Sequence, residues 1–295
     1  MPVAIGINPI TWSNDDMPEL GADIPLETCL SEAKAAGYEG IELGRKFPRE
    51  AKTLGPILAR HGLRLASGWY GARLLERSAE AEVAALESHL ALLEALGAKV
   101  MVFAETSGSI AGLKSRPLST RPRLEEGQWP SFAARLTMVA DHLARRGVRM
   151  AYHHHMGTVI ESAAEIDRLM ALAGESVGLL LDTGHLAYAG GDPLELARRH
   201  AGRINHVHCK DVRALVLARA KASDRGFLAA VLDGVFTVPG DGSIDYGPLL
   251  AELKRAHYGG WLVVEAEQDP AKAHPLTYAT MGERYLREAA RAAGL

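Results

Sequence analysis

Short apolar runs alternate with amphipathic stretches of helical length along the chain. A short continuous apolar run is typical of a strand buried in a parallel sheet, whereas apolar residues three and four apart predict a helix. The predicted strands are Val3–Ile7, Gly40–Leu43, Leu63–Ser67, Val100–Phe103, Val148–Tyr152, Val177–Leu181, Ile204–His208 and Trp261–Val264. The predicted helices are Leu26–Ala36, Lys52–His61, Glu80–Leu96, Ser131–Arg146, Ser162–Ala173, one begun by Asp192-Pro193, Tyr246–Ala256 and Leu276–Ala293.

The alternation gives eight strand–helix units, which predict an α/β protein with parallel pairing and right-handed crossovers. Eight units favour a closed (β/α)₈ TIM barrel over an open doubly wound sheet. No composition break marks a second domain, so we expect residues 1–295 to form one domain. Two long connections, Glu105–Pro130 and Asp211–Asp245, follow strands and should lie on the active rim; the second contains a helical-looking piece, Arg213–Leu232. Each is either a lid or substrate loop or a tolerated surface insertion.

Composition narrows the class of protein. The chain has 295 residues, of which 47% are hydrophobic, and a net charge of −3, which leaves no basic footprint for nucleic acid. Cys29 and Cys209 lie far apart in the sequence, so a disulfide framework is not expected and a reducing compartment fits. The N-terminus shows no signal-peptide pattern, and no apolar run is long enough to span a membrane. We therefore expect a cytoplasmic protein without nucleic-acid or membrane partners.

Four of the apolar runs end in residue types that bind metals. These residues are His153-His154-His155, Asp182, His206 with His208, and Glu265. The carboxyl ends of barrel strands meet at one rim, where such barrels keep their chemistry. A mixed imidazole and carboxylate set without thiolate favours Mn²⁺, Co²⁺ or Zn²⁺ over a structural zinc site. The endings predict a divalent-metal site that faces a small polar substrate.

Each ending also has an alternative explanation. Asp182 could serve as a helix N-cap or turn residue. His206 and His208 should share one side of their strand, with His208 as the better ligand and His206 as its partner or a substrate contact. Glu265 needs a partner, because an unpaired buried charge is costly, and a metal would supply one. Glu267 points the same way and could form a structural salt bridge instead.

The histidine triplet leaves its own assignment open. His153 and His155 should share one face and His154 the other, so the sequence does not settle which of them binds a metal. A surface histidine cluster without function is the alternative. His185, three residues after Asp182, could face the same cavity.

Further rim residues suit a polyol ring. Asn8 and Trp12 offer hydrogen bonds and an apolar face, and Glu42 ends the second strand as Glu265 ends the eighth. Cationic side chains that could bind anionic or enolate oxygens are Lys46, Lys210 and Arg213. Core packing is the alternative for Trp12, and a solvated surface charge is the alternative for each cation.

At these residues the chain resembles the xylose-isomerase-like barrel superfamily of sugar isomerases and epimerases. That family's metal set is Glu, Asp, His and Glu at the ends of strands five to eight, and Asp182, His208 and Glu265 match the last three. The family's Asp-x-x-His turn, His-x-His strand and approach to the seventh helix resemble residues 182–185, 206–208 and 239–246. The first Glu falls on His153. The family's isomerases and epimerases use that Glu as an acid/base group, so its loss argues against simple epimerisation.

Within the superfamily, the chain more closely resembles the inosose dehydratase (2-keto-myo-inositol dehydratase) family. The resemblance spans essentially the whole chain and rests on residues 6–15 (GINPITWSND), 40–48 (GIELGRKFP) and 152–158 (YHHHMGT). It implies a Co²⁺- or Mn²⁺-dependent hydro-lyase of inositol catabolism. Its substrate would be a cyclic polyol ketone and its product a trihydroxycyclohexane-1,2-dione.

The resemblance and the residues together give a hypothesis for the site. The metal ligands would be His153, Asp182, His208 and Glu265, and Glu265 would also be the candidate base. His155, if His153 binds the metal, or else His185, would protonate the leaving hydroxyl. Lys210 and Glu42 would orient ring oxygens. The remaining substrate contacts would be Asn8, Trp12, Lys46, His206 and Arg213.

Three other functions compete with this hypothesis. A metal-dependent ketose or inosose isomerase/epimerase would share the enediolate but return the proton. A metal phosphodiesterase or endonuclease usually needs more ligands and a basic groove. A non-catalytic polyol-binding protein would retain the barrel fold without catalysing a reaction. The sequence leaves open whether the chain forms a homo-oligomer, which metal it uses and which inosose isomer it prefers.

Overall fold

The computed structural model describes residues 3–295 and contains a closed parallel barrel of eight strands, in the order β1-β10-β7-β6-β5-β4-β3-β2. The pairing of β10 with β1, with Val264 opposite Ile7, closes the barrel. The predicted (β/α)₈ fold is confirmed. The barrel strands are β1 (Ala4–Ile7), β2 (Gly40–Leu43), β3 (Arg64–Ala72), β4 (Val100–Glu105), β5 (Arg149–His153), β6 (Val177–Asp182), β7 (Ile204–Cys209) and β10 (Trp261–Val264).

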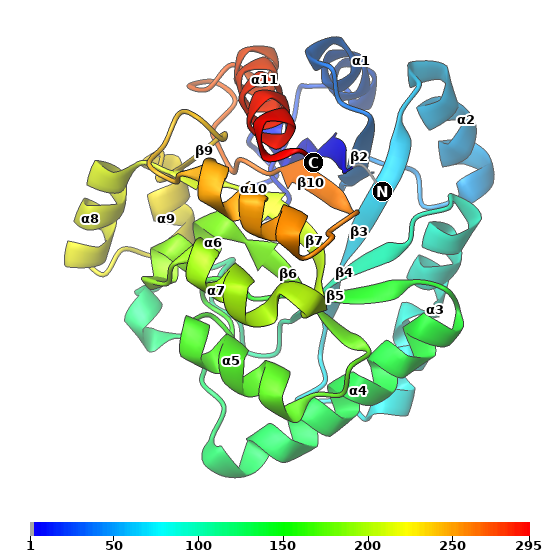
Figure 1. Ribbon diagram of the computed structural model, residues 1–295, viewed down its shortest axis with the longest axis vertical. Helices are drawn as coiled ribbons and strands as arrows, with labels where there is room; N and C mark the ends of the chain where they lie inside the picture. The colour runs from blue at the N-terminus through cyan, green and yellow to red at the C-terminus, as the bar shows by residue number, and fades with distance from the viewer. Residues whose placement is uncertain (1–2) are drawn as a thin grey trace.

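The helices surround the barrel (Figure 1). They are α1 (Leu26–Ala36), α2 (Ala51–His61), α3 (Ala79–Ala95), α4 (Trp129–Arg145), α5 (Ala163–Leu172), α6 (Thr183–Ala189), α7 (Pro193–His200), α8 (Ala214–Ala222), α9 (Phe227–Leu232), α10 (Tyr246–Arg255) and α11 (Pro275–Ala293). Local chemistry sets many of their ends. Gly37 and Gly62 adopt left-handed conformations that end α1 and α2, and Ser162 forms a capping box with Glu165 at the start of α5.

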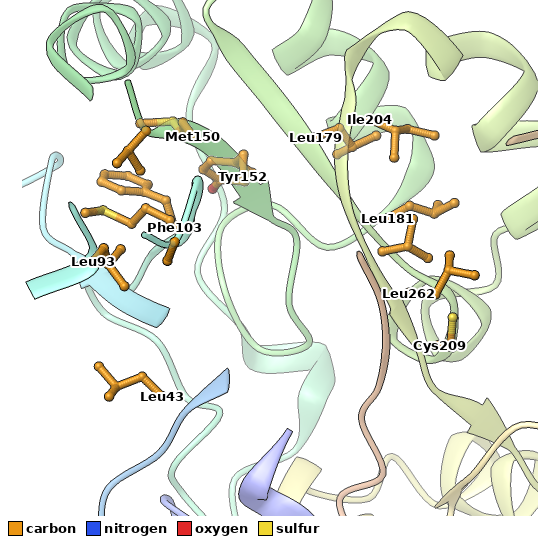
Figure 2. Packing of buried hydrophobic residues seen from close by; sticks show 14 of the residues in the cluster. Leu43, Leu93, Phe103, Met150, Tyr152, Leu179, Leu181, Ile204, Cys209 and Leu262 are labelled. Atoms are coloured by element: carbon orange, nitrogen blue, oxygen red, sulfur yellow. The ribbon is translucent and has the colours of Figure 1, made fainter. Parts of the chain in front are cut away.

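Strand alternation divides the barrel residues between two faces. Figure 2 shows one set, in which Phe103, Met150, Tyr152, Leu179, Leu181 and Leu262 belong to the large core that includes residues of the surrounding helices. The residues between them include Val102, Ala151 and Leu180, which form a separate buried cluster in the barrel interior. By the same parity, His153, Asp182, His206, His208 and Glu265 lie on the interior face at the carboxyl ends of their strands.

Some elements differ from the sequence prediction. Strand β3 continues to Ala72 and β4 to Glu105, beyond the predicted apolar runs. Helix α6 forms where the sequence suggested only a turn, because Asp182 caps a segment too short to show helical periodicity. The predicted helical piece 213–232 is divided into α8 and α9, with a break at Ser223–Gly226, where Asp224 has a positive φ of 45°.

The two long rim connections meet above the barrel. Pro117 and Gly226 form an isolated antiparallel bridge, and the Ser119 amide donates to Asp224 at 2.9 Å. The second connection also contains a small antiparallel pair, β8 (Asp211–Val212) with β9 (Phe236–Thr237). Each connection is therefore fastened to the other.

No helix within residues 3–295 is both long and apolar enough to cross a membrane. Cys29 and Cys209 are free and buried.

Candidate active site

Asp182 serves two purposes at the end of β6. Its Oδ1 accepts a hydrogen bond from the His185 amide at 2.8 Å, which caps α6. Its Oδ2 is buried and has no hydrogen-bond partner. His153 Nε2 and His208 Nδ1 each lie 3.5 Å from this oxygen. The cap and the ligand role proposed from the sequence are compatible, because they use different oxygens.

Four side chains converge beside this oxygen. Ligand atoms of His153, Asp182, His208 and Glu265 all lie within 4.8 Å of one another, and all four residues are buried. His208 Nδ1 and Glu265 Oε2 are in close contact, yet neither atom has a hydrogen-bond partner. Leaving buried polar atoms unpaired costs about 1–3 kcal/mol each, so this arrangement fits a bound cation. The structure thus brings His153, rather than His154 or His155, into the predicted ligand set.

The electrostatics of His208 point the same way. Burial favours the neutral ring, but the carboxylates of Glu265 and Glu42 outweigh it and raise the pKa of His208 well above its ordinary value. The centre therefore attracts positive charge. A divalent cation with oxygen and imidazole ligands is compatible with this donor set.

Glu42 adjoins the ligand set, and protein groups already occupy both of its carboxylate oxygens. It contacts His206 Nε2 at 2.8 Å and His208 Nε2 at 3.2 Å, and it accepts from Asn8 Nδ2 at 2.7 Å and from Ser67 Oγ. Burial raises the pKa of Glu42, but the charge of His208 and the histidine hydrogen bonds hold it well below its ordinary value. Glu42, expected to orient ring oxygens, instead forms a buried network with His206 that orients His208 so that Nδ1 faces the ligand set; His206 is thus the partner of His208, one of the two roles that the sequence allowed.

We predict that Glu42→Gln weakens divalent-cation binding about 10- to 100-fold, as expected for a partner that orients a ligating imidazole. The amide cannot accept from both histidines as the carboxylate does. Calorimetric titration with Mn²⁺ measures the change. Ser67→Ala, which removes one hydrogen bond to Glu42 and leaves both histidine contacts, is the matched control and should have a much smaller effect. Equal affinities for Glu42→Gln and the wild type would contradict the orienting role.

A second group lies next to the ligand set. Lys210 is fully buried; its Nζ pairs with Glu267, lies 3.0 Å from His185 Nε2, and is 3.6 Å from Glu265 and 3.8 Å from Asp182. Burial lowers the pKa of Lys210, but the carboxylates of Glu265, Glu267 and Asp182 outweigh it and raise the pKa above its ordinary value. Lys210 is therefore an ammonium ion.

His185, beside this ammonium ion, and His155, which packs against His185, are both neutral. Burial, followed by the charges of His155 and Lys210, lowers the pKa of His185 well below its ordinary value. Burial and His153 lower the pKa of His155 to about 4. Their rings lie 3.9 Å apart between centroids, and Phe227 from the second rim connection packs against both.

A cavity of about 320 Å³ opens above these groups. Its lining is formed by Asn8, Ile10, Asp15, Asp16, Leu43, Trp69, Thr106, Ser109, Ala111, Gly112, His155, Thr158, Glu265 and Glu267. A larger hollow of about 840 Å³ is lined by residues such as Ala4, Leu65 and Trp261, near the amino ends of the strands, and contains no His, Asp, Glu or Cys. The smaller cavity is therefore the candidate active site.

Trp69 provides an aromatic wall for this cavity. It is 43% exposed, and its ring lies edge-on to His153 and His155, with centroid distances of 5.2 and 5.9 Å. Trp12, predicted for such a role, is instead in the core, where Nε1 donates to Glu32 at 2.6 Å. The exposed indole is suited to packing against the carbon face of a ring.

Two predicted cationic contacts lie elsewhere. Lys46 donates to the backbone carbonyls of Gly21, Ala22 and Ile24, and so holds the loop after β1. Arg213 binds Asp241 and the carbonyls of Gly234 and Phe236 within the second rim connection. Neither lines the cavity, because backbone and carboxylate acceptors near in space already bind both cations.

Sequence reasoning missed most of the cavity's loop residues. Asp15, Asp16, Thr106, Ser109 and Thr158 come from connections without apolar periodicity. The sequence gives one indication for Glu267: it follows Glu265 by two residues, so both side chains should point to the same side of an extended segment.

We predict that Asp16→Asn stabilises the protein above pH 6. Burial, followed by the charges of Glu267 and Asp15, raises the pKa of Asp16 from 3.8 to about 6. Because the pKa of Asp16 is higher in the folded than in the unfolded protein, ionising this carboxyl costs folding free energy. The cost grows as the pH rises from 3.8 to about 6 and is complete above that. Although neighbouring groups desolvate its carboxyl, the Asp16 side chain still reaches solvent, which screens its charge; the gain should therefore stay below about 1 kcal/mol, and it should vanish below pH 4. Thermal melts at pH 4 and 7.5 test this, with Asp23→Asn in the same loop as control; an equal gain at both pH values would contradict it.

The fold and site together define a TIM barrel with an imidazole–carboxylate centre at the carboxyl ends of its strands. A family model described as "Xylose isomerase-like TIM barrel" matches residues 30–291, and the chain belongs to this family.

Curated relatives refine the comparison. The rhizopine catabolism protein MocC of Rhizobium meliloti is 55% identical over 295 residues, covering 100% of this chain and 90% of the relative. The inosose dehydratase of Geobacillus thermodenitrificans is 46% identical over 288 residues, and that of Lacticaseibacillus casei is 43% identical; each alignment covers 97% of both chains. The resemblance to inosose dehydratases is confirmed.

Solved structures agree on the fold. An L-ribulose 3-epimerase superposes with a TM-score of 0.68 at 18% identity, covering 99% of this chain and 96% of that one. A probable 3-DHS dehydratase, AsbF from Bacillus anthracis, gives a TM-score of 0.70 at 14% identity, covering 97% and 99%. At these identities the likeness shows the barrel and not the reaction.

Proposed function

We propose that the chain is an inosose dehydratase that removes water from 2-keto-myo-inositol and forms a trihydroxycyclohexane-1,2-dione in inositol catabolism. The carrying observation is that buried, unpartnered ligand atoms of Asp182, His208 and Glu265 converge below a cavity whose lining includes carboxylates and hydroxyl groups. The names of the relatives at 46% and 43% identity support the reaction. The name of the Rhizobium relative specifies a catabolic route but no reaction.

The cavity supports an uncharged polyol as substrate. Its volume of about 320 Å³ is at the small end of the range for ligand sites. Carboxylates and hydroxyl groups line it, and its lining contains no arginine or lysine that would bind a phosphate. Trp69 offers the ring an apolar face, and Asp15 and Asp16 offer acceptors for hydroxyl groups at the mouth.

His153, Asp182, His208 and Glu265 would hold the divalent cation, which we propose to be Mn²⁺ or Co²⁺ from the resemblance to inosose dehydratases. When bound, such a cation supplies Lewis-acid polarisation of a ketone oxygen. We assign Glu265 to the ligand set through Oε2, which is unpartnered and close to His208 Nδ1.

His155 is the proton carrier that we assign to the reaction. Its Nδ1 lies 2.8 Å from the Met156 carbonyl, which can only accept, so Nδ1 carries the hydrogen and Nε2 keeps a lone pair. His155 thus begins as a base rather than as the acid that the sequence suggested. Nε2 takes the proton from the carbon beside the ketone and gives it to the departing β-hydroxyl, which leaves as water. The resulting enol then tautomerises to the dione.

His185 supports this ring rather than meeting the substrate. It is 1% exposed, does not line the cavity, and lies between the His155 ring and Lys210 Nζ. Lys210 is likewise buried below the cavity, so we assign both residues to positioning.

The test is turnover of inosose by purified protein, first stripped of metal and then reconstituted with Mn²⁺ or Co²⁺. We expect dione absorbance to appear only in the reconstituted protein. Deuterium exchange at carbon without water loss would replace the proposal with an isomerase or epimerase. Polyol binding without either reaction would indicate a non-catalytic barrel.

A further inference from the structure

A second cluster of ligand-type side chains adjoins the first. Ligand atoms of His155, His185 and Glu267 lie within 4.8 Å of one another. A cation is already present there, because Lys210 Nζ pairs with Glu267 and lies 3.0 Å from His185 Nε2. A second divalent ion would have to displace this buried ammonium ion. The cluster is therefore better explained by contact with substrate than by a second metal.

Glu267 is the member of this cluster that can accept a further hydrogen bond. It is 2% exposed and lines the cavity. One oxygen, Oε1, is paired with Lys210, whereas Oε2 is buried and has no hydrogen-bond partner. A buried carboxylate oxygen without a partner is costly, and a donor from a bound ligand would satisfy it.

The neighbouring atom in the cavity is also an acceptor. His155 lines the same cavity, and its Nε2 keeps a lone pair because Nδ1 is bonded to the Met156 carbonyl. In the proposed reaction Nε2 meets a ring C–H, so the adjacent acceptor, Glu267 Oε2, is the atom left to take a hydrogen bond from a hydroxyl donor. A hydroxyl group on the neighbouring ring carbon supplies that donor, whereas an ether or a deoxygenated carbon does not.

We propose that Glu267 is a specificity-determining residue that accepts a hydrogen bond through Oε2 from a ring hydroxyl beside the carbon on which His155 acts. This inference rests on the proposed function and extends it to substrate selection. Lys210 holds the carboxylate in place through Oε1. An inosose analogue that is deoxygenated or O-methylated at this position should bind about 10- to 100-fold more weakly, because Oε2 stays buried and unpaired.

The test uses Glu267→Gln in the metal-loaded protein, since the amide oxygen can still accept from Lys210 while the amide nitrogen replaces Oε2. We expect KM for inosose to rise about 10- to 100-fold with kcat changed much less, as for a contact made equally in the ground and transition states. The affinity for myo-inositol, which lacks the ketone and cannot react, should fall in parallel in calorimetry. Mn²⁺ affinity should stay at the wild-type value, whereas Glu265→Gln should lose it.

Unchanged KM and unchanged myo-inositol affinity would overturn the inference, and so would loss of Mn²⁺ from Glu267→Gln, which would make Glu267 a metal ligand. Glu267→Asp, which withdraws the carboxylate by one methylene, should give the same rise in KM if the amide variant does not fold. If wild-type protein binds myo-inositol but does not dehydrate inosose, the proposed reaction fails, while the myo-inositol comparison still decides the role of Glu267.

Discussion

Asp182→Asn should abolish divalent-cation binding and turnover while leaving the metal-free protein folded. Asparagine is as good an N-cap as aspartate, so its Oδ1 can still accept from the His185 amide and start α6. The amide nitrogen, however, replaces the unpartnered Oδ2 and turns an acceptor into a donor. We expect Mn²⁺ affinity to fall by about 100-fold or more and kcat/KM by about 10³-fold or more, since a ligand is a stronger contributor than its supporting partners.

The metal-free comparison separates the two uses of Asp182. Calorimetry with Mn²⁺ should show lost binding, and thermal melts without metal should show a folded protein whose stability falls only by the lost pairing of the Asp182 charge with Lys210. Asp182→Ala removes the cap as well and should lose about 1 kcal/mol of folding free energy in addition. Retention of wild-type Mn²⁺ affinity by Asp182→Asn would exclude Oδ2 from the metal site.

The barrel could be predicted because its strands have a clear local pattern. Continuous apolar runs such as β6 and β10 are buried on both faces, and the period-two alternation of a strand is enough to predict that His208 lies on the same side as His206. The convergence of the ligand-type residues follows from closing eight parallel strands, since their carboxyl ends then surround one small area. The eight apolar runs predict the closed barrel, and the closed barrel in turn brings these ligand-type residues together.

The supporting interactions could not be predicted in the same way. Glu42 ends its strand as Glu265 does, yet only the closed barrel shows that His206 and His208 use its oxygens. Lys46 is bound by carbonyls of a loop with no periodic pattern. A side chain's type indicates what it can bind, whereas its actual partner depends on long-range packing.

Lys210→Met should destabilise the metal-free protein by about 3–5 kcal/mol at pH 8, the usual cost of removing one partner from a buried ion pair. Lys210 Nζ is the ammonium ion next to Glu267, Glu265 and Asp182, and methionine would fill its volume without its charge. Because His185, which supports the His155 ring, would lose this neighbour, we also expect kcat to fall by about 10²-fold, and because Glu267 would lose its partner, KM should rise. Lys99→Met, at an exposed position, is the control for loss of a lysine charge.

The destabilisation caused by Lys210→Met should depend on pH and on metal. Burial raises the pKa of Asp182, but the Lys210 ammonium ion outweighs it and holds that pKa well below 3.8, so this pairing adds stability above pH 4 and loses it as the pH falls further. The difference between variant and wild type should therefore stay constant down to about pH 4 and narrow only as the pH falls below that value. Saturating Mn²⁺ should also reduce it, because the cation binds only the folded centre and replaces part of the missing positive charge. Urea unfolding without metal at pH 8 and pH 3, and at pH 8 with saturating Mn²⁺, measures both effects; a difference that is constant across these conditions would show that Lys210 contributes packing and not charge.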